Sequence, residues 1–424
     1  MENSSGLLGL IVALINRRRT KKALERIEDT NRENRGIIHY QPSNIEAFFD
    51  ENEPICNMVF SGGLNTIRCR SVSRAIECAV IQGYHPVVLH ASNIDLEQTL
   101  LSNFGPQYVS VANKGNPIYD PFYKKTNADI NRLVLTSGTK GTEVNSAGKY
   151  YIDGISDFIR AKRITPYIDM YITCPHMDLL DKINELEMQG GITDTEARRI
   201  TSKIIQGEME RGNIENFFSR FSMQAAGILA DKSQLLYAVN VNISAKRNQI
   251  LAIDINSTTS TLFLNMIGSE IEMELEAGRK IAVFLDGIPL QASDSMQNLI
   301  KKSGNNCCVV MSSDDAYAEF NGDDNGFYSY LGKCSKAILS KHSSAHSCQK
   351  WADYIGSYDK HEITTTFAEN ANYVGQWGMG ATQTANINVK RENIIKPEDL
   401  LRMNPNEVFV QNKNNGEISY TMVV

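Results

Sequence analysis

The feature that most constrains the fold is a glycine-containing loop between a buried strand and a helix. Residues 56–60 form an apolar run typical of a buried strand, and the loop Ser61–Arg70 follows it directly. A helical pattern at 72–82 and a second apolar run at 86–89 come next. This strand–loop–helix–strand order is the context in which phosphate-binding loops occur. It therefore predicts an α/β domain built around a nucleotide-binding frame.

The residues of this loop depart from the phosphate-binding pattern G-x-x-x-x-G-K-[ST]. Gly62 occupies the first position, but Ile67 stands at the second glycine and Arg68 at the lysine. A β-branched residue resists positive φ, and a guanidinium does not reproduce the point charge of lysine. Cys69 replaces the hydroxyl residue that binds magnesium, and sulfur is a poor ligand for that hard cation. A weakened ATP site is expected, and the residues predicted to lie near its phosphates are Gly62, Gly63, Arg68 and Cys69.

A second element of a nucleotide site is an apolar strand that ends in an aspartate. Residues 280–287 read Lys-Ile-Ala-Val-Phe-Leu-Asp-Gly, the form of a Walker B strand. Asp286 is the candidate for holding a magnesium-bound water, and it is the single candidate catalytic residue. Gly287 stands where a hydrolytic ATPase carries glutamate, and losing a general base costs about 10²–10⁴ in rate. Binding of ATP and Mg²⁺ is conceivable, whereas efficient hydrolysis is not expected.

The charge and the cysteine content indicate which partners the protein can bind and in which cellular compartment it works. The 424-residue chain has a net charge of −6, which argues against an extended nucleic-acid-binding surface on an isolated subunit. A local basic rim around a central channel is compatible with that charge. The eight cysteines lie at irregular positions without a C-x-x-C pair. Reduced thiols and a cytoplasmic setting are therefore expected.

The N-terminal segment joins an apolar run to a basic one. Gly6–Ile15 is uncharged, and Arg17–Lys22 is rich in arginine and lysine. A helix over the apolar run would span about 15 Å, half of the roughly 30 Å hydrocarbon core, so it is not a complete transmembrane helix. Residues 6–22 are predicted either to anchor the protein at the inner face of the cell membrane or to form a helix that packs on a partner or on the body of the protein.

The rest of the pattern describes an α/β domain with a helical insertion. Residues 1–45 contain the N-terminal helix and a linker, and 46–175 the first part of the α/β domain. Residues 176–235 read as an all-α domain, with a capping box at Thr193–Glu196. The second part of the α/β domain, 236–424, shows strand patterns at 249–255, 280–286, 307–311, 336–340 and 407–410. Strands that alternate with helices predict a largely parallel sheet.

A group of cysteines and histidines is a candidate zinc site. Its members, all within residues 334–348, are Cys334, His342, His346 and Cys348. On a helix, His342 and His346 would share one face and could ligate zinc. The segment has no partner knuckle elsewhere, and its serine-rich stretch is typical of a strand that leaves into a loop. Zinc is therefore disfavoured.

The order of these elements resembles the type IV coupling proteins of conjugation and type IV secretion, the TraG/TraD-like ATPases. The resemblance covers about residues 56–419 and is carried by motif positions. These are the loop 62–69, the turn Asn116–Ile118, the strand end 284–287, the helix 351–356, and the terminal helix and strand 397–410. The helical block stands where the family inserts an all-α domain. A serine in 309–313 takes the place of the family's nucleotide-sensing glutamine.

The resemblance implies a RecA/FtsK-like P-loop domain of the FtsK/HerA type with an inserted all-α domain. It further implies a component of a bacterial conjugation or type IV secretion system at the cytoplasmic face of the membrane. Such a component recruits DNA or protein substrate, or scaffolds assembly with other secretion subunits, in a homo- or hetero-hexameric ring. The departures from the family pattern concentrate at catalytic positions, which favours a pseudo-ATPase.

Two other functions remain open from the sequence. The first is an active DNA- or protein-translocating ATPase with unusual catalytic residues. The second is a scaffold or adaptor of another secretion or injection apparatus, with no nucleotide function.

Overall fold

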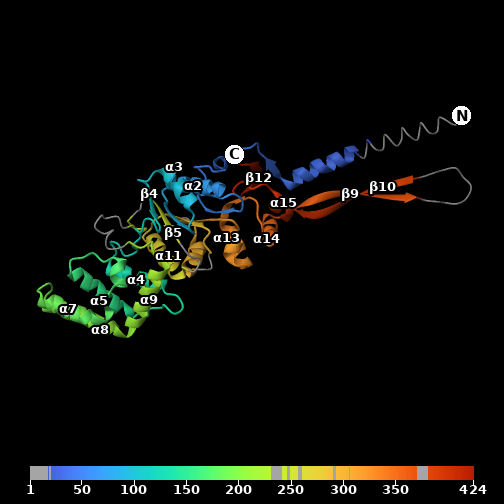
Figure 1. Cartoon of the computed structure of the whole chain (residues 1–424). Helices are drawn as coiled ribbons and strands as arrows, with labels where there is room; N and C mark the ends of the chain where they lie inside the picture. Colours follow the sequence, from blue (N-terminus) through green and yellow to red (C-terminus); the bar gives the residue numbers. More distant parts are fainter. Residues whose placement is uncertain are drawn as a thin grey trace, which may run out of the picture.

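Three parts follow one another along the molecule: a helical block, a central sheet and a projecting ribbon (Figure 1). The computed structural model describes residues 18, 21–230, 241–245, 249–255, 260–289, 293–304, 306–369 and 381–424. The predicted apolar run 6–15 lies outside these residues. None of the described helices is long and apolar enough to cross a membrane.

The central sheet has ten strands in the order β1-β12-β11-β8-β2-β7-β6-β3-β5-β4. All neighbouring pairs are parallel except the two that β11 makes, with β8 and β12. This confirms the predicted largely parallel α/β fold. The strands are β1 (Ile37–His39), β2 (Asn57–Ser61), β3 (His85–His90), β4 (Val109–Ala112), β5 (Ile250–Asp254), β6 (Ile281–Asp286), β7 (Cys307–Ser313), β8 (Cys334–Leu339), β11 (Glu407–Asn412) and β12 (Glu417–Met422).

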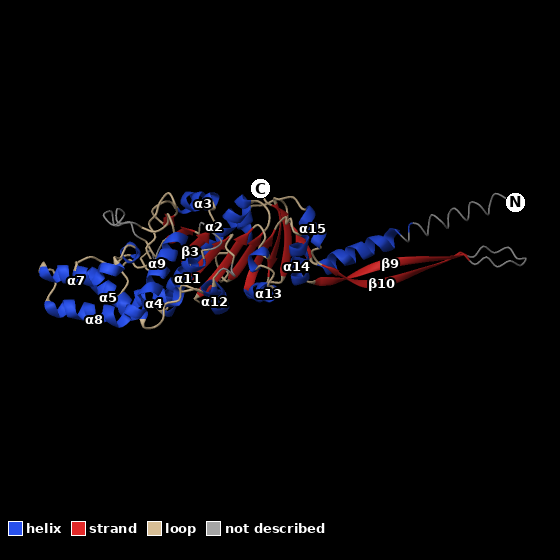
Figure 2. Ribbon diagram, turned by 60° about the horizontal axis from the view of Figure 1, so that its bottom comes forward, coloured by secondary structure: helices blue, strands red, loops and turns tan. Residues whose placement is uncertain are grey.

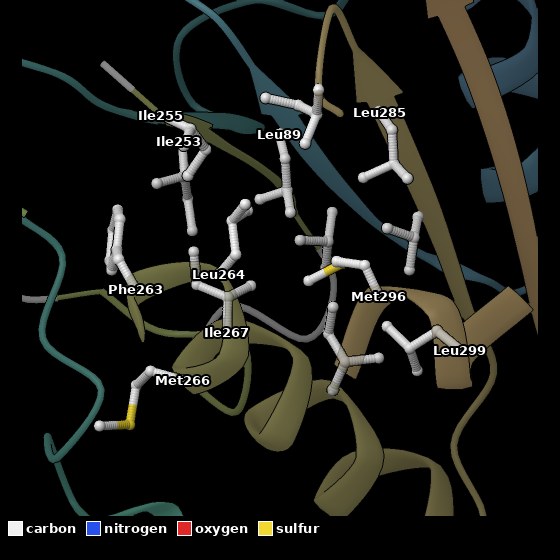
Figure 3. Close-up of a cluster of buried hydrophobic side chains, with 14 of the residues drawn as sticks. Leu89, Ile253, Ile255, Phe263, Leu264, Met266, Ile267, Leu285, Met296 and Leu299 are labelled. Carbon is white, nitrogen blue, oxygen red and sulfur yellow. The ribbon is translucent and has the colours of Figure 1, made fainter. Parts of the chain in front are cut away.

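Helices cover both faces of the sheet, which explains why its inner strands are apolar on both sides (Figure 2). One face packs against α2 (Asn65–Ile81), α3 (Ile94–Phe104) and the short η1 (Ile45–Phe48). The other packs against α11 (Thr261–Glu276), α12 (Asp294–Lys302), α13 (Asp324–Lys333), α14 (Ala345–Ile355) and α15 (Pro397–Arg402). Figure 3 shows this second core, where Leu89 and Leu285 of the sheet meet Leu264, Met296 and Leu299.

The helical block consists of α4 (Asn127–Ser137), α5 (Gly148–Ala161), α6 (Ile168–Ile172), α7 (Leu179–Met188), α8 (Asp194–Gly207) and α9 (Arg211–Gln224). The capping box predicted at Thr193 opens α8. Helices α5 and α8 lie close together because Gly154 leaves room for the Ile204 side chain and Gly207 lies against Tyr151. Since α5 precedes residue 176, these contacts favour a helical domain that begins earlier than predicted, a division that remains a proposal.

The ribbon is a long hairpin that the sequence pattern did not predict. It pairs β9 (Ser357–Glu369) with β10 (Ala381–Asn393) and follows directly after α14, which ends at Ile355 and is capped by Gly356 with φ 103°. A helix over residues 21–35 lies beside it (Figure 1). The ribbon and this helix project from the body at the end opposite the helical block (Figure 2).

Candidate functional site

A cavity of about 580 Å³ opens at the carboxyl ends of the central parallel strands. Its walls come from the segments that follow β2, β3, β6 and β7, the position at which open α/β sheets bind ligands. Two sequence-predicted residues, Arg68 and Asp286, line it. Gly62, Gly63 and Cys69 are not among its lining residues. The structure thus brings the two charged candidates together and leaves the other three outside the cavity wall.

The loop after β2 is shorter than the sequence pattern indicated. Helix α2 begins at Asn65 rather than at residue 72, so Arg68 and Cys69 are helical. Ile67, which was aligned with the second glycine of the phosphate loop, is the third residue of α2. The physical reason is that no glycine follows Gly63, and a chain without positive-φ positions continues directly into the helix.

The two glycines of the short loop pack against the chain itself. Gly62 and Gly63 have φ of +83° and +70°. A Cβ on Gly62 would meet the Lys341 carbonyl oxygen at 2.6 Å, and one on Gly63 would clash with the Ser340 side chain. The Gly62 N–H donates to the Ser313 carbonyl at 3.0 Å, and the Gly63 N–H to the Lys341 carbonyl at 2.8 Å. Both amides are already bonded, whereas a phosphate cradle needs amides that are free.

A buried histidine holds this loop in place. His342 Nε2 lies 2.7 Å from Ser61 Oγ, and its Nδ1 lies 2.8 Å from the Ser340 carbonyl oxygen. Ser61 Oγ accepts from the Ala316 N–H at 2.9 Å, so we assign its hydroxyl as donor to Nε2 and Nδ1–H as donor to Ser340. Burial lowers the pKa of His342, which keeps the ring neutral, as this assignment requires. The network fixes the ends of β2, β7 and β8 to one another.

Arg68 is engaged within the protein. Its Nη1 donates to the carbonyl oxygens of Gly62 at 3.2 Å and Gly63 at 2.9 Å. Its Nη2 forms an ion pair with Asp314, whose side chain is 86% exposed, while the Arg68 side chain is only 10% exposed. The guanidinium therefore stabilises the loop by bonding to its carbonyl oxygens. Binding a phosphate would require it to give up or share the Asp314 carboxylate.

Asp286 lines the cavity, and Cys69 lies near enough behind it to be affected by its charge. Asp286 Oδ1 accepts from Ser312 Oγ at 2.5 Å, and Oδ2 accepts from Asn93 Nδ2 at 2.6 Å. Burial, and then the Asp286 charge, raises the pKa of the Cys69 thiol to about 12. A neutral thiol does not supply the hard oxygen ligand that Mg²⁺ takes from the P-loop hydroxyl. These residues do not fit the usual magnesium site of a P-loop protein.

The sequence motifs missed most of the acidic groups around the cavity. Beside Asp286, the lining contains Asp95, Asp314, Asp315 and Glu319, with Arg68 as its one cationic side chain among the described residues. Ser313 Oγ donates to Glu319 at 2.6 Å. Burial, and then the charges of Asp315 and Asp286, raises the pKa of Glu319. No motif marks Glu319, which reaches the site from the turn after β7.

The side chains proposed for zinc each have other contacts. His342 precedes α14 and belongs to the loop network, while His346 Nε2 lies 3.2 Å from the Tyr317 hydroxyl. Cys334 donates to the Tyr330 carbonyl, and Cys348 is buried in α14. Within the described ranges, no group of three or more histidine, cysteine or acidic side chains is arranged to hold a metal ion.

Comparison with known proteins shows the fold. No family model and no curated protein matches the sequence. The unbound monoclinic form of the bacterial conjugative coupling protein TrwBΔN70 matches the structure with a TM-score of 0.50 and 11% identity, over 87% of this chain and 84% of that one. TrwB in complex with ADP and Mg²⁺ matches with a TM-score of 0.46 and 10% identity, over 87% of this chain and 85% of that one. VirB4 of Thermoanaerobacter pseudethanolicus matches with a TM-score of 0.43 and 10% identity, over 87% of this chain and 89% of that one.

The first of these matches carries the fold assignment. It shows that the chain has the fold of a conjugative coupling protein, a P-loop ATPase fold with a mostly parallel sheet. This confirms the resemblance and the RecA/FtsK-like fold predicted from the order of motifs.

Proposed function

We propose that the protein is a coupling-protein-like component of a bacterial conjugation or type IV secretion system that hydrolyses ATP weakly or not at all. It recruits DNA or protein substrate, or scaffolds assembly, at the cytoplasmic face of the membrane. The shared fold supports the type of machine. The geometry of the loop after β2 supports the loss of catalysis.

The main observation behind the proposal is that the polar groups of the loop after β2 are already bonded to other groups of the protein. The Gly62 and Gly63 amides donate to backbone carbonyls, and Arg68 is paired with Asp314. Freeing one buried amide costs about 1–3 kcal/mol, so rebuilding a cradle from both opposes nucleotide binding by several powers of ten. The surplus of carboxylates in the cavity adds electrostatic repulsion toward an anionic ligand.

The assembly that this function requires is also part of the proposal. Residues 6–22, with their apolar and basic runs, contact the membrane surface. The protein acts beside other secretion-system subunits, including an active ATPase, in a homo- or hetero-hexameric ring. The support for these points is the sequence of the N-terminal segment and the likeness to a coupling protein.

The experiment is nucleotide binding and turnover with the purified full chain. ATP and ADP are titrated with and without Mg²⁺ by calorimetry, and phosphate release is followed for hours. We expect weak or no binding and no turnover above the rate of the Asp286→Ala variant. Robust Mg²⁺-dependent hydrolysis that Asp286→Ala abolishes would overturn the proposal. Complete lack of binding, with no effect of nucleotide on melting, would favour the nucleotide-independent scaffold or adaptor.

One observation favours an active translocating ATPase with unusual catalytic residues as the second candidate. Glu319 lines the cavity with a raised pKa, the property of a carboxylate suited to general-base work. If this candidate is correct, Glu319→Gln removes turnover, whereas Asp323→Asn, in the exposed turn that follows, leaves it unchanged. Absence of turnover in the wild type excludes the candidate.

A further inference from the structure

The ribbon formed by β9 and β10 lacks the support that most sheets have. Its two strands pair over 13 residues each, from Ser357–Asn393 at the base to Glu369–Ala381. It extends away from the central sheet, and its neighbour along the described part is the helix over residues 21–35 (Figures 1 and 2). A two-stranded ribbon alone is marginally stable in water. Its edges therefore decide what else it binds.

One edge of the ribbon is covered by asparagine side chains of the helix. Asn31 Nδ2 donates to the His361 carbonyl at 2.9 Å, and the His361 N–H donates to Asn31 Oδ1 at 2.7 Å. Asn34 Nδ2 donates to the Asp359 carbonyl at 3.0 Å. The backbone groups of His361 thus point outward, away from β10. His361 and its partner Val389 form a non-hydrogen-bonded pair, so the backbone groups of Val389 also point outward, at the opposite edge.

The opposite edge, along β10, is open. By the alternation of the ladder, Ile387, Val389 and Arg391 turn their N–H and C=O groups outward there. Among the described residues, neither Ile387 nor Val389 has a hydrogen-bond partner on that side. Their side chains are 62% and 59% exposed. An open strand edge with exposed apolar side chains is a template for another strand.

We propose that β10 pairs antiparallel with β10 of a second copy of this chain, in the register centred on Asn388. In this register Ile387 lies opposite Val389 of the second copy, and the symmetry repeats that apolar pair. Lys390 and Arg391 fall opposite positions 386 and 385, which are asparagine and alanine, so no like charges oppose each other. The two ribbons become one four-stranded sheet, which meets the size that independent stability requires.

This pairing does not depend on the nucleotide site or on the proposed function. Its elements are the register of β9 with β10, the asparagine-covered edge and the exposed apolar pair on the open edge. A centre shifted by one residue to Val389 would place Arg391 opposite Ile387 on both sides and leave one apolar pair, Val389 with itself, in place of two. The register centred on Asn388 is therefore the favoured one.

A cysteine cross-link tests the register directly. Residue 388 lies opposite itself as a non-hydrogen-bonded pair, with Cα atoms about 4.5 Å apart, within the range that a disulfide spans. We expect the oxidised full chain with Asn388→Cys to form covalent dimers. Lys390→Cys, on the same face, stays monomeric because residue 390 lies opposite 386. Wild type gives the background from the native thiols, most of which are buried. Equal cross-linking of both variants, or of neither, overturns the proposal.

Sedimentation velocity over a range of concentrations tests the contact without a cross-link. We expect wild type to dimerise reversibly and Val389→Lys to weaken dimerisation at least about tenfold, because each apolar pair becomes a lysine–isoleucine pair. Met188→Lys, a matched change at an 80% exposed site on α7, leaves the equilibrium unchanged. A wild type that is monomeric at every concentration, or equal effects of the two lysines, overturns the proposal.

Discussion

At the scale of single residues, the glycines of the loop after β2 are used for close packing within the protein. The positive φ that lets a glycine approach a phosphate also lets Gly62 and Gly63 approach the segment Ser340–His342. Arg68 keeps a positive charge near the phosphate position, but its guanidinium is hydrogen-bonded to loop carbonyls and paired with Asp314. In this structure these residues stabilise the loop itself.

Removing the Asp314 carboxylate should make the cavity more receptive to anions. Asp314→Ala removes one negative charge and leaves Arg68 Nη2 with only a long bond to Asn65 Oδ1 at 3.5 Å, and an ion pair with a carboxylate this exposed contributes about 0–1 kcal/mol. We expect ATP or inorganic phosphate to bind up to about fivefold more tightly, measured by competition with a fluorescent nucleotide. Asp323→Ala, in an exposed turn outside the cavity, is the control and leaves affinity unchanged. Equal affinities for Asp314→Ala and wild type would show that Arg68 stays committed to the loop carbonyls.

Gly63→Ala should destabilise the fold more than the same change at an equally strained glycine elsewhere. Gly83 has φ of +77°, and a Cβ added there would have no atom within 4 Å, so Gly83→Ala adds backbone strain alone, about 1–2 kcal/mol. Gly63→Ala adds similar strain and a clash with Ser340, a further 1–3 kcal/mol or so. Urea denaturation of both variants measures the difference. Equal losses would mean that the loop can move away from Ser340.

At the scale of elements, hydrogen bonds to one carboxylate connect α9 with the approach to α5. Glu210 is 8% exposed and accepts from Asn213 Nδ2 at 3.0 Å and from the Asn145 side chain and N–H at 2.9 and 3.1 Å. The Asn213 bond, followed by those of Asn145, lowers the pKa of Glu210. The helical block therefore owes part of its stability to an ionised Glu210.

The lowered pKa of Glu210 predicts how stability changes with pH. Its contribution is present above the unfolded-state pKa of about 4.3 and is lost as pH falls through the lower folded-state value. Glu210→Gln should lower the free energy of unfolding at pH 7 and flatten its decline on the acid side. Chemical denaturation from pH 7 to pH 3 measures both. Glu398→Gln, at an exposed carboxylate, should reproduce the wild-type slope, and an unchanged slope in Glu210→Gln would contradict the prediction.

At the scale of the whole molecule, we expect the ribbon and the body to be separable parts. Replacing residues 363–387 with Asn-Gly closes a shorter ribbon at the hydrogen-bonded pair Glu362–Asn388. The helix contacts of Asn31 and Asn34 survive this change. We expect the melting temperature to change by less than about 2 °C, because the body keeps both of its cores.

Calorimetry of the shortened variant, with Gly63→Ala as the destabilised reference, checks this expectation. A fall in melting temperature as large as that of the reference would show that the ribbon supports the body. Sedimentation of the same variant should show no dimer, since the Ile387–Val389 pairs are gone.

Local patterns in the sequence were sufficient to predict the strand–loop–helix–strand unit, Asp286 at the end of β6 and the capping box of α8. These follow from periodicity and short-range capping, which the chain carries within a few residues. The sequence also indicated the fold, because the order of its elements matches that of a coupling-protein fold. The start of α2 was placed too late, at residue 72, because residues 65–71 were read as part of the loop.

The contents of the site depend instead on the tertiary structure. The parallel sheet brings Asp95, Asp314 and Glu319 to Asp286 from segments far apart in sequence, so no motif contains them all. The bonding of the loop amides to the ends of β7 and β8 is likewise a result of the assembled sheet. The ribbon was not predicted because the described side chains of β10, at residues 387–393, form no buried face, and the register depends on pairing between two separate strands. Contacts between distant segments depend on the whole fold, which local patterns do not record.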